Sequence, residues 1–245
     1  MLRKDEAVCI RAIDYSDTSQ VVTLFCRQAG KISAIAKGSK RPKSPFGGPV
    51  ELLSHGMIVY TDRPEARLSS LTEFGQQGGF IGLRRQLATL NAALFAVELL
   101  NALTTDNDPY PHVFDDLLRF LGDLDSVCGD IESLRLLVVF QAALLGGLGM
   151  GLTLDRCANC SSKYDAHWPL VFFSTSAGGI LCRNCEGSFP DRISLSRQAG
   201  ACLGDMRFLG GASDAAIREV EKVIIFHFTA ILHHPPRMAR YFLSA

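Results

Sequence analysis

The sequence lacks the short motifs that mark several common enzyme classes. It contains no Gly-x-x-x-x-Gly-Lys-Ser/Thr phosphate loop, no Gly-x-Ser-x-Gly nucleophile elbow and no His-Glu-x-x-His pair. The glycine-rich stretch at residues 146–151 follows a predicted helix, whereas a dinucleotide-binding loop follows a strand. It is better explained as the end of that helix. We therefore expect a protein that is not an enzyme.

Long apolar runs and a secretion signal are missing as well. The longest apolar stretch, residues 134–148, is interrupted by Arg135 and Gln141 and is too short to cross a bilayer, so it predicts a buried helix. The N-terminal residues 1–6 are mostly charged and contain no apolar core. Eight cysteines without such a signal point to a reducing compartment. We expect a cytoplasmic protein with no membrane partner.

The whole chain has no excess of positive or negative charge, but its charged residues are unevenly distributed. The 245 residues have a formal net charge of +0, yet residues 1–45 contain nine Lys and Arg against four Asp and Glu. A neutral chain can therefore still present a basic face near its N-terminus. The sequence also shows no internal repeat and no low-complexity segment, which argues against a solenoid or a disordered tail.

The pattern of apolar residues changes near residue 78 and predicts two domains. Residues 1–78 contain five short β-rich runs punctuated by Gly and Pro, which predict a small barrel, most simply an OB fold that binds nucleic acid. The predicted strands are residues 7–13, 20–26, 31–36, 50–60 and 67–74.

Residues 79–245 show helical periodicity instead. Apolar residues recur at spacings of three and four from Phe80 to Val97, and the first helix is predicted to run from about Phe80 to Leu103. Further helices are predicted at residues 113–124, 131–148, 196–209 and 214–232. The fold class is thus α+β and multidomain, with a barrel followed by an α-helical domain.

Two Cys-x-x-Cys pairs lie within the helical part. Cys157 and Cys160 are separated by 21 residues from Cys182 and Cys185. Four thiolates in two short-range pairs match a tetrahedral structural Zn²⁺, which leaves no open position for water or substrate. The spacer predicts a hairpin, so residues of about 154–188 are expected to form a zinc ribbon inserted between the third and fourth helices.

Other interpretations of the cysteines remain open. One Cys-x-x-Cys pair could serve a thiol oxidoreductase, and iron or unpaired thiols are further possibilities. His167 is a possible substitute ligand, although packing or surface exposure beside Trp168 is the simpler interpretation. The remaining cysteines are isolated among apolar neighbours and are expected to be buried small hydrophobes; they are Cys9, Cys26, Cys128 and Cys202.

A basic loop follows the third predicted strand. Lys37, Lys40, Arg41 and Lys43 fall within seven residues, and Gly38 with Pro42 suggests an extended, exposed loop. Such a cluster suits phosphate oxygens, because neutralising the backbone of DNA releases counterions. A solvated loop without a partner is the alternative, and the predicted barrel favours nucleic acid over it.

Neighbouring residues leave the extent of this basic surface open. Arg84 and Arg85 could extend it or face solvent. Phe25, Phe46 and Tyr60 could provide stacking platforms for bases or belong to the core, and the core is favoured for Phe25.

Taken together, these features resemble the bacterial RecO recombination-mediator family. The resemblance covers the whole chain in order and is most specific in the segment that contains Leu154, the four cysteines, Phe172 and Gly178-Gly179. The chain departs from the family pattern at two places. Ser161 stands where a Gly commonly follows the second Cys, and Ser39-Lys40 replaces the more usual Ala-Arg. Neither departure removes a ligand or a charge.

The resemblance implies a non-catalytic, nucleoid-associated DNA-repair factor with a structural zinc ion. It would bind single- and double-stranded DNA, anneal complementary strands coated with single-strand-binding protein and work with RecR to load RecA. The resemblance assigns DNA binding to the four cations of the loop and zinc ligation to the four paired cysteines. A zinc-ribbon interaction scaffold without direct DNA binding is the main alternative function.

Overall fold

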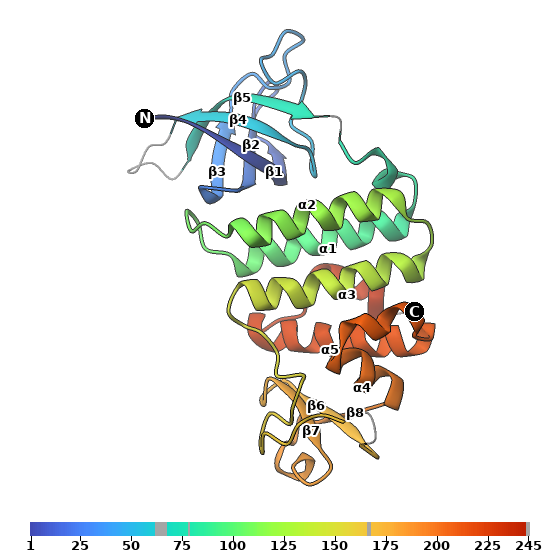
Figure 1. Cartoon of the computed structure of the whole chain (residues 1–245). Helices are drawn as coiled ribbons and strands as arrows, with labels where there is room; N and C mark the ends of the chain where they lie inside the picture. Colours follow the sequence, from blue (N-terminus) through green and yellow to red (C-terminus); the bar gives the residue numbers. More distant parts are fainter. Residues whose placement is uncertain (62–67, 78, 166–167, 244–245) are drawn as a thin grey trace. The chain divides into compact units, whose positions relative to one another are not determined.

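The computed structural model describes residues 1–61, 68–77, 79–165 and 168–243. These residues form two compact units, the first made of residues 1–85 and 97–125 and the second of residues 86–96 and 126–245. Helix α1 (Leu87–Leu103) contributes to both. Figure 1 shows the strand-rich first part and the helices that follow it along the chain. Within the described segments, no helix combines the length and apolarity needed to span a membrane.

Five strands of the first unit close into a barrel in the order β1-β2-β3-β5-β4. They are β1 (Leu2–Asp14), β2 (Gln20–Cys26), β3 (Gly30–Ala36), β4 (His55–Thr61) and β5 (Ser69–Gln77). All pairings are antiparallel except the short β3–β5 pairing of Ala34–Ala36 with Ser69–Leu71. Inward residues such as Leu24, Ile58 and Phe74 fill the barrel, as the alternation of side chains along a strand requires.

Two candidate stacking aromatics belong to this interior. Phe46 and Tyr60 are almost fully buried in the barrel core. Phe25 is also fully buried, as predicted, but it points outward from β2, and its ring lies 6.1 Å from that of Phe114. Phe114 belongs to helix α2 (Pro111–Ser126), so α2 covers this part of the barrel exterior.

Lys31 and Gly30 hold the turn between β2 and β3 against the helical part of the same unit. The Lys31 ammonium is buried and donates to the carbonyl oxygens of Asn101 and Thr104 at 2.8 and 2.6 Å. These carbonyls lie at the end of α1, where backbone acceptors lack helical partners. Gly30 has a φ of 69°, and a Cβ there would lie 2.0 Å from the Asp108 carbonyl oxygen.

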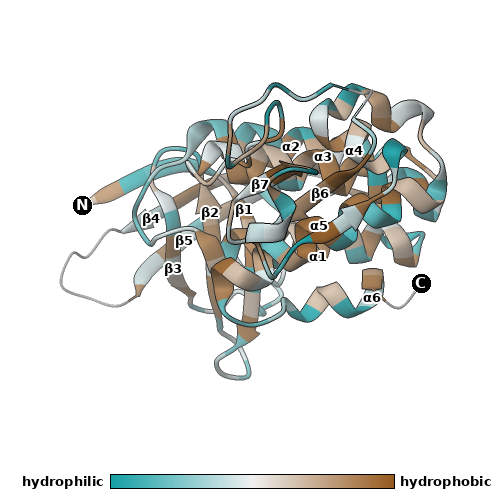
Figure 2. Cartoon of the chain, turned by 90° about the horizontal axis from the view of Figure 1, so that it is seen from below, coloured by the Kyte–Doolittle hydropathy of each residue, from teal (hydrophilic) through white to brown (hydrophobic). Residues whose placement is uncertain are grey.

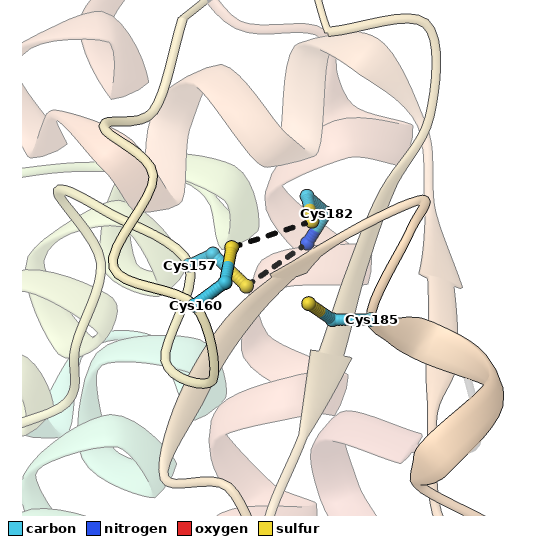
Figure 3. Close-up of side chains that lie close together, drawn as sticks. All are labelled: Cys157, Cys160, Cys182 and Cys185. Carbon is cyan, nitrogen blue, oxygen red and sulfur yellow. Dashed lines mark hydrogen bonds between the residues drawn. The ribbon is translucent and has the colours of Figure 1, made fainter.

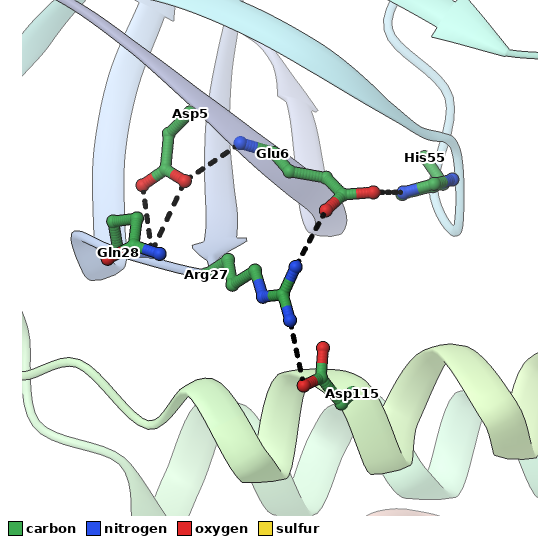
Figure 4. A network of polar contacts seen from close by, with 6 residues as sticks. All are labelled: Asp5, Glu6, Arg27, Gln28, His55 and Asp115. Atoms are coloured by element: carbon green, nitrogen blue, oxygen red, sulfur yellow. Dashed lines mark hydrogen bonds and ion pairs between the residues drawn. The ribbon is translucent and has the colours of Figure 1, made fainter.

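A polar network joins the same turn to α2 (Figure 4). Arg27 Nη2 lies 3.0 Å from Asp115 Oδ2, and Arg27 Nη1 lies 3.9 Å from Glu6 Oε2. The other Glu6 oxygen is 2.9 Å from His55 Nε2. Asp5 accepts the backbone N–H groups of Gln28 and Glu6. The network orients the turn by charge-assisted hydrogen bonds.

Several predicted boundaries in the first unit and at its junction differ from the structure. The first strand begins at Leu2 instead of residue 7. The fourth strand begins at His55 instead of residue 50, because residues 51–54 form a turn in which Leu53 has a φ of 67°. The first helix begins at Leu87 instead of Phe80. Residues 81–84 form the short 3-10 helix η1, held by a hydrogen bond of 3.2 Å from the Leu83 N–H to Asp125 Oδ1. Arg67, the predicted start of the fifth strand, lies outside the described residues, and β5 is described from Ser69.

Helices and a small sheet make up the second unit. Its helices include α3 (Asp130–Gly147), α4 (Arg197–Gly204), α5 (Asp214–Leu232) and α6 (Arg240–Leu243), with short 3-10 helices η2 (Glu186–Ser188), η3 (Met206–Gly211) and η4 (Arg237–Ala239). The Ser196 and Ser213 hydroxyls cap α4 and α5 by accepting N–H groups of their first turns. Helix α3 packs against α5, and α5 packs against α4.

One predicted helix is interrupted. Residues 196–209 were expected to be continuous, but the chain extends at Asp205, whose φ is −152°, and continues as η3. The Asp205 carboxylate accepts the Arg207 N–H and so begins the new turn. Gly204 lies against Tyr164, and a Cβ there would approach the ring to 2.6 Å. Helix α4 therefore ends where Gly204 packs closely against Tyr164 of the cysteine-rich segment.

That segment is a three-stranded sheet in the order β7-β6-β8, made of β6 (Val171–Ser174), β7 (Gly179–Cys182) and β8 (Ile193–Leu195). The predicted hairpin is present as β6 and β7, whereas β8 was not predicted. The hydropathy colouring of Figure 2 shows apolar residues along β6, which contains Val171 and Phe173. Phe173 is fully buried, and its ring lies 6.1 Å from that of His227 on α5.

Candidate functional site

The four paired cysteines converge on one point in the second unit (Figure 3). Their sulfur atoms all lie within 4.8 Å of one another, and Cys160 Sγ is 3.8 Å from Cys182 Sγ. A zinc ion bound at about 2.3 Å by four sulfurs would separate them by about 3.8 Å. The sulfurs present therefore fit a tetrahedral Zn²⁺. All eight cysteines are free thiols rather than disulfides.

Backbone turns bring each pair of sulfurs together. The Ser161 N–H donates to the Cys157 carbonyl at 2.9 Å, and the Cys185 N–H donates to the Cys182 carbonyl at 3.0 Å. Ser161 has a φ of 60°, a left-handed conformation in which Gly is favoured. Ser161 therefore occupies a backbone conformation that Gly would adopt with less strain.

Glycines in the hairpin allow the first cysteine turn to approach the second. Gly178 has a φ of 67° in the β6–β7 turn. At Gly179 a Cβ would lie only 2.2 Å from the Thr153 carbonyl oxygen, because residue 153 pairs with it as an isolated bridge. The two glycines thus position the chain before Cys157 beside the strand that ends at Cys182.

The sulfur atoms also take part in hydrogen bonds, Cys157 Sγ as an acceptor and Cys160 Sγ as a donor. The Cys182 N–H donates to Cys157 Sγ at 3.4 Å, and Cys160 Sγ lies 3.2 Å from Ser162 Oγ. The Ser162 side chain and backbone lower the pKa of Cys160 to about 6, whereas burial first of all raises the pKa of Cys182 to about 12. Zinc binding would release the protons that remain on the sulfurs, since thiolates are the ligands. The four cysteines together could hold a metal ion.

The remaining cysteines and His167 were also assigned roles from the sequence. Cys9, Cys26 and Cys202 are buried as expected, and burial raises the pKa of each. Cys128 is exposed, so the prediction that it is buried was wrong. It lies in the short link between α2 and α3 instead of on a packed face. His167 lies outside the described residues.

The basic loop forms part of the first unit and consists of turns rather than an extended segment. The Arg41 N–H donates to the Gly38 carbonyl at 3.0 Å, the Ser44 N–H donates to the Arg41 carbonyl at 3.1 Å, and Gly38 has a φ of 70°. The expectation of an extended loop was therefore wrong. Backbone groups of the loop form hydrogen bonds with one another, and these turns keep the loop compact.

A single side chain of β2 anchors this loop. Gln20 Oε1 accepts hydrogen bonds from the Ser39 hydroxyl at 2.9 Å and from the Val50 N–H at 2.8 Å. Gln20 Nε2 donates to the Val50 carbonyl at 3.2 Å. Ser39 and Gln20 are buried, so these bonds are shielded from water. Gln20 thus fixes the β3–β4 connection to the barrel near its start, at Ser39, and near its end, at Val50.

The four cations of the loop are not equivalent. Lys37, Arg41 and Lys43 are exposed, and within residues 1–61 and the other described ranges no ion pair is found for them. Lys40 Nζ instead lies 2.7 Å from Asp14 Oδ2. The Arg84 guanidinium lies 2.5 Å from Glu51, so it is also engaged within the unit. Three unpaired cations remain in the loop to attract an anion.

Sequence reasoning missed a second set of exposed residues beside this loop. Tyr15 is 67% exposed and Ile13 is 44% exposed, and Arg11 lies two residues before Ile13. The alternation of β1 places Arg11 and Ile13 on its outer face, since Ala12 between them packs against the barrel core. Strict alternation was hidden by the bulge between Cys9 and Arg11.

A small closed barrel, followed by a helical unit with a cluster of four cysteines, defines a two-part α+β protein that can bind a metal ion. Residues 1–76 match the family described as "Recombination protein O N terminal", and residues 84–224 match "Recombination protein O C terminal". The chain belongs to the RecO family of DNA repair proteins.

Relatives named DNA repair protein RecO agree with this assignment. The chain is 36% identical over 200 residues to a DNA repair protein RecO of Rhodopirellula baltica, covering 82% of this chain and 73% of the relative. It is 34% identical over 222 residues to that of Bacillus cereus strain B4264, covering 87% and 84%. It is 32% identical over 212 residues to that of Anaeromyxobacter dehalogenans, covering 86% and 81%.

Proposed function

We propose that this RecO-family protein is a non-catalytic mediator of DNA repair and recombination. It binds single- and double-stranded DNA through an OB-fold barrel, anneals complementary strands and, with RecR, helps to load RecA on DNA covered by single-strand-binding protein. It acts in the cytoplasm, at the nucleoid. A structural Zn²⁺ bound by the four paired cysteines stabilises its ribbon.

The observation that carries the proposal is the exposed basic loop. Lys37, Arg41 and Lys43 project from a compact series of turns that Gln20 fixes to the barrel. Cations held in this way neutralise phosphates with little further loss of side-chain and backbone freedom. Neutralising two strands lowers their mutual repulsion while bases pair. Annealing by this route breaks and forms no covalent bond.

The arrangement of the zinc cluster supports a structural role for the metal. Cysteine occupies all four positions of the tetrahedron, so no position is left for water or substrate. Cys157 and Cys185 are buried, and apolar residues that include Trp168 and Phe189 pack against them. The metal therefore serves the fold of the second unit, while phosphate binding belongs to the first.

A salt titration with a labelled oligonucleotide tests DNA binding. We expect a variant with Lys37→Ala, Arg41→Ala and Lys43→Ala to bind a single strand more weakly. The slope of log K against log salt should fall in magnitude by about 2, given about 0.7 per phosphate contact. Strand annealing, measured with and without single-strand-binding protein, should slow in parallel.

The matched control removes the same charge from helices of the chain. A variant with Arg119→Ala, Arg197→Ala and Lys222→Ala loses three exposed cations outside the barrel and should keep the wild-type slope. If the loop variant binds as tightly as wild type, or if wild type shows no binding at low salt, the proposal fails. The interaction scaffold without DNA contact would then be favoured.

A further inference from the structure

The four cysteines of the metal cluster differ in how far they are open to solvent. Cys157 is fully buried and Cys185 is 8% exposed, and apolar residues pack against both. Cys182 is half-buried, whereas Cys160 is exposed. Each Cys-x-x-Cys turn therefore contributes one inner and one outer cysteine. The outer cysteines are Cys160 of the first turn and Cys182 of the second.

The two outer sulfurs face each other across the cluster (Figure 3). Cys160 Sγ lies 3.8 Å from Cys182 Sγ. A disulfide bond is about 2.0 Å long, so the two atoms would have to approach by about 1.8 Å to bond. The inner Cys157 Sγ instead accepts the backbone N–H of Cys182 at 3.4 Å. The inner sulfur is thus engaged with the main chain, and the outer pair is arranged for cross-linking.

Access decides which of the four sulfurs a dissolved oxidant reaches first. Zinc ligation would hold all four as thiolates, the form that reacts with peroxide, so charge alone does not distinguish them. Ser162, which is polar and exposed, lies beside Cys160, with its Oγ 3.2 Å from Cys160 Sγ. Trp168 and Phe189 pack against the inner pair instead. An oxidant therefore meets Cys160 before it meets Cys157 or Cys185.

We propose that Cys160 is an oxidation site and that Cys182 is the thiol that resolves it, so that peroxide exchanges the metal for a disulfide. The inference rests on the structural zinc of the proposed function and deepens it, because it gives the ribbon a second, oxidised state. Both states contain a link between the first and second cysteine turns. One link is the metal, and the other is the disulfide.

The steps balance with hydrogen peroxide as the oxidant. The Cys160 thiolate attacks one peroxide oxygen, the O–O bond breaks, and the products are a sulfenic acid on Cys160 and a hydroxide ion. The Cys182 thiolate then attacks the Cys160 sulfur, the S–S bond forms, and the S–O bond breaks with loss of a second hydroxide. Both hydroxides take up protons from solvent to become water. The two sulfurs lose one electron each, and the peroxide gains both.

The oxidation removes two of the four metal ligands. Cys157 and Cys185 alone do not complete a tetrahedron, so the metal would dissociate. The disulfide joins residues that are 22 apart in the chain, and such a cross-link restricts the unfolded state. The oxidised protein should therefore unfold at a higher temperature than the reduced protein from which a chelator has removed the metal.

The test adds a small excess of hydrogen peroxide to the full zinc-bound chain. A chromogenic chelator follows zinc release, and mass spectrometry of peptides maps the disulfides. About one zinc ion per chain should be released as a Cys160–Cys182 link forms, and dithiothreitol with added zinc should reverse both changes. A link within one turn, between Cys157 and Cys160 or between Cys182 and Cys185, overturns the inference. Zinc release without any disulfide overturns it as well.

Cys160→His is the matched variant, because a site of three Cys and one His still holds zinc while the exposed ligand is no longer a thiol. It should keep its zinc under the same peroxide treatment. Cys128→Ser, which removes an exposed thiol outside the cluster, should release zinc as wild type does. Equal release from Cys160→His and wild type overturns the role of Cys160.

Zinc content before peroxide is added separates this inference from the proposed function. A chain isolated without zinc would contradict the structural metal and, with it, the exchange. A chain that holds zinc and keeps it in peroxide would contradict the exchange alone.

Discussion

The Lys40 ammonium of the basic loop lies 2.7 Å from the carboxylate of Asp14, the last residue of β1. The pair is partly exposed and contributes at most about 1 kcal/mol to stability. Its larger effect is on charge, because Asp14 neutralises a lysine that would otherwise face phosphates. The loop presents fewer free cations than its sequence suggests.

Asp14→Asn should therefore increase DNA affinity. The change frees Lys40 and removes a negative charge, and the magnitude of the salt slope for a single strand should rise by up to about 0.7. Asp17→Asn is the control, since it removes one negative charge from the neighbouring β1–β2 loop and frees no lysine of the described residues. Fluorescence anisotropy over a salt series measures both. An unchanged slope for Asp14→Asn would show that Lys40 does not reach phosphate.

Removal of zinc should destabilise the second unit without abolishing phosphate binding. We expect one zinc ion per chain, lost in Cys157→Ser, with a lower unfolding temperature for this variant and for wild type after chelation. Cys128→Ser, which changes an exposed thiol outside the cluster, should retain the metal. Elemental analysis and thermal unfolding measure the two effects. A metal-free protein that unfolds at the same temperature as the metal-bound one would contradict the structural role.

Glu221 should make the stability of the second unit depend on pH. It is buried between α5 and α3, where burial raises its pKa to about 8 despite a hydrogen bond of 3.0 Å from Gln141 Nε2. The unfolded carboxyl has a pKa of about 4.3. The folded state therefore binds the proton more tightly, and stability is lost as pH rises from about 4.3 to about 8.

Glu221→Gln should abolish much of this pH dependence. An amide has no proton to lose, and the variant should gain on the order of 2–4 kcal/mol over wild type near pH 8, with little difference near pH 4.5. The control is Glu73→Gln, because Glu73 is an exposed residue of β5. The stability of this variant should change with pH as that of wild type does. Urea unfolding at several pH values provides the measurement. Parallel stability curves for wild type and Glu221→Gln would contradict the assignment.

Lys31→Met should destabilise the first unit by about 2–3 kcal/mol. Methionine keeps an apolar stem, but the Asn101 and Thr104 carbonyls lose their buried donor. Lys37→Met, which changes an exposed lysine of the same barrel, should alter stability by less than about 0.5 kcal/mol. Denaturant midpoints compare the two. Equal stability of the Lys31 and Lys37 variants would show that water satisfies these carbonyls.

Much of the fold could be predicted from local patterns. The strand at Gln20–Cys26 and the helix at Asp214–Leu232 have the predicted bounds, because turn residues and the Ser213 cap mark their ends. The strand start at His55 and the helix break at Asp205 could not be predicted. Both depend on contacts with distant parts of the chain or on a left-handed residue, which single-sequence patterns do not show.

The candidate sites divide in the same way. The spacing of the cysteines was enough to predict their convergence, because each Cys-x-x-Cys turn is local. The pairing of Lys40 with Asp14 and the exposure of Ile13 depend on strand register in the barrel. Register is a tertiary property, and a bulge in β1 shifted the alternation that would have indicated it.

The position of the ribbon in the chain affects the order of folding. Helix α3 ends at Gly147 and α4 begins at Arg197, so α3 can pack against α5 only by closing the long segment between them. A metal that joins Cys157 to Cys185 removes much of that segment from the loop. Halving a loop lowers its closure cost by about 0.6 kcal/mol. Metal binding would thus shorten the effective loop and lower the entropy cost of bringing α3 and α5 together.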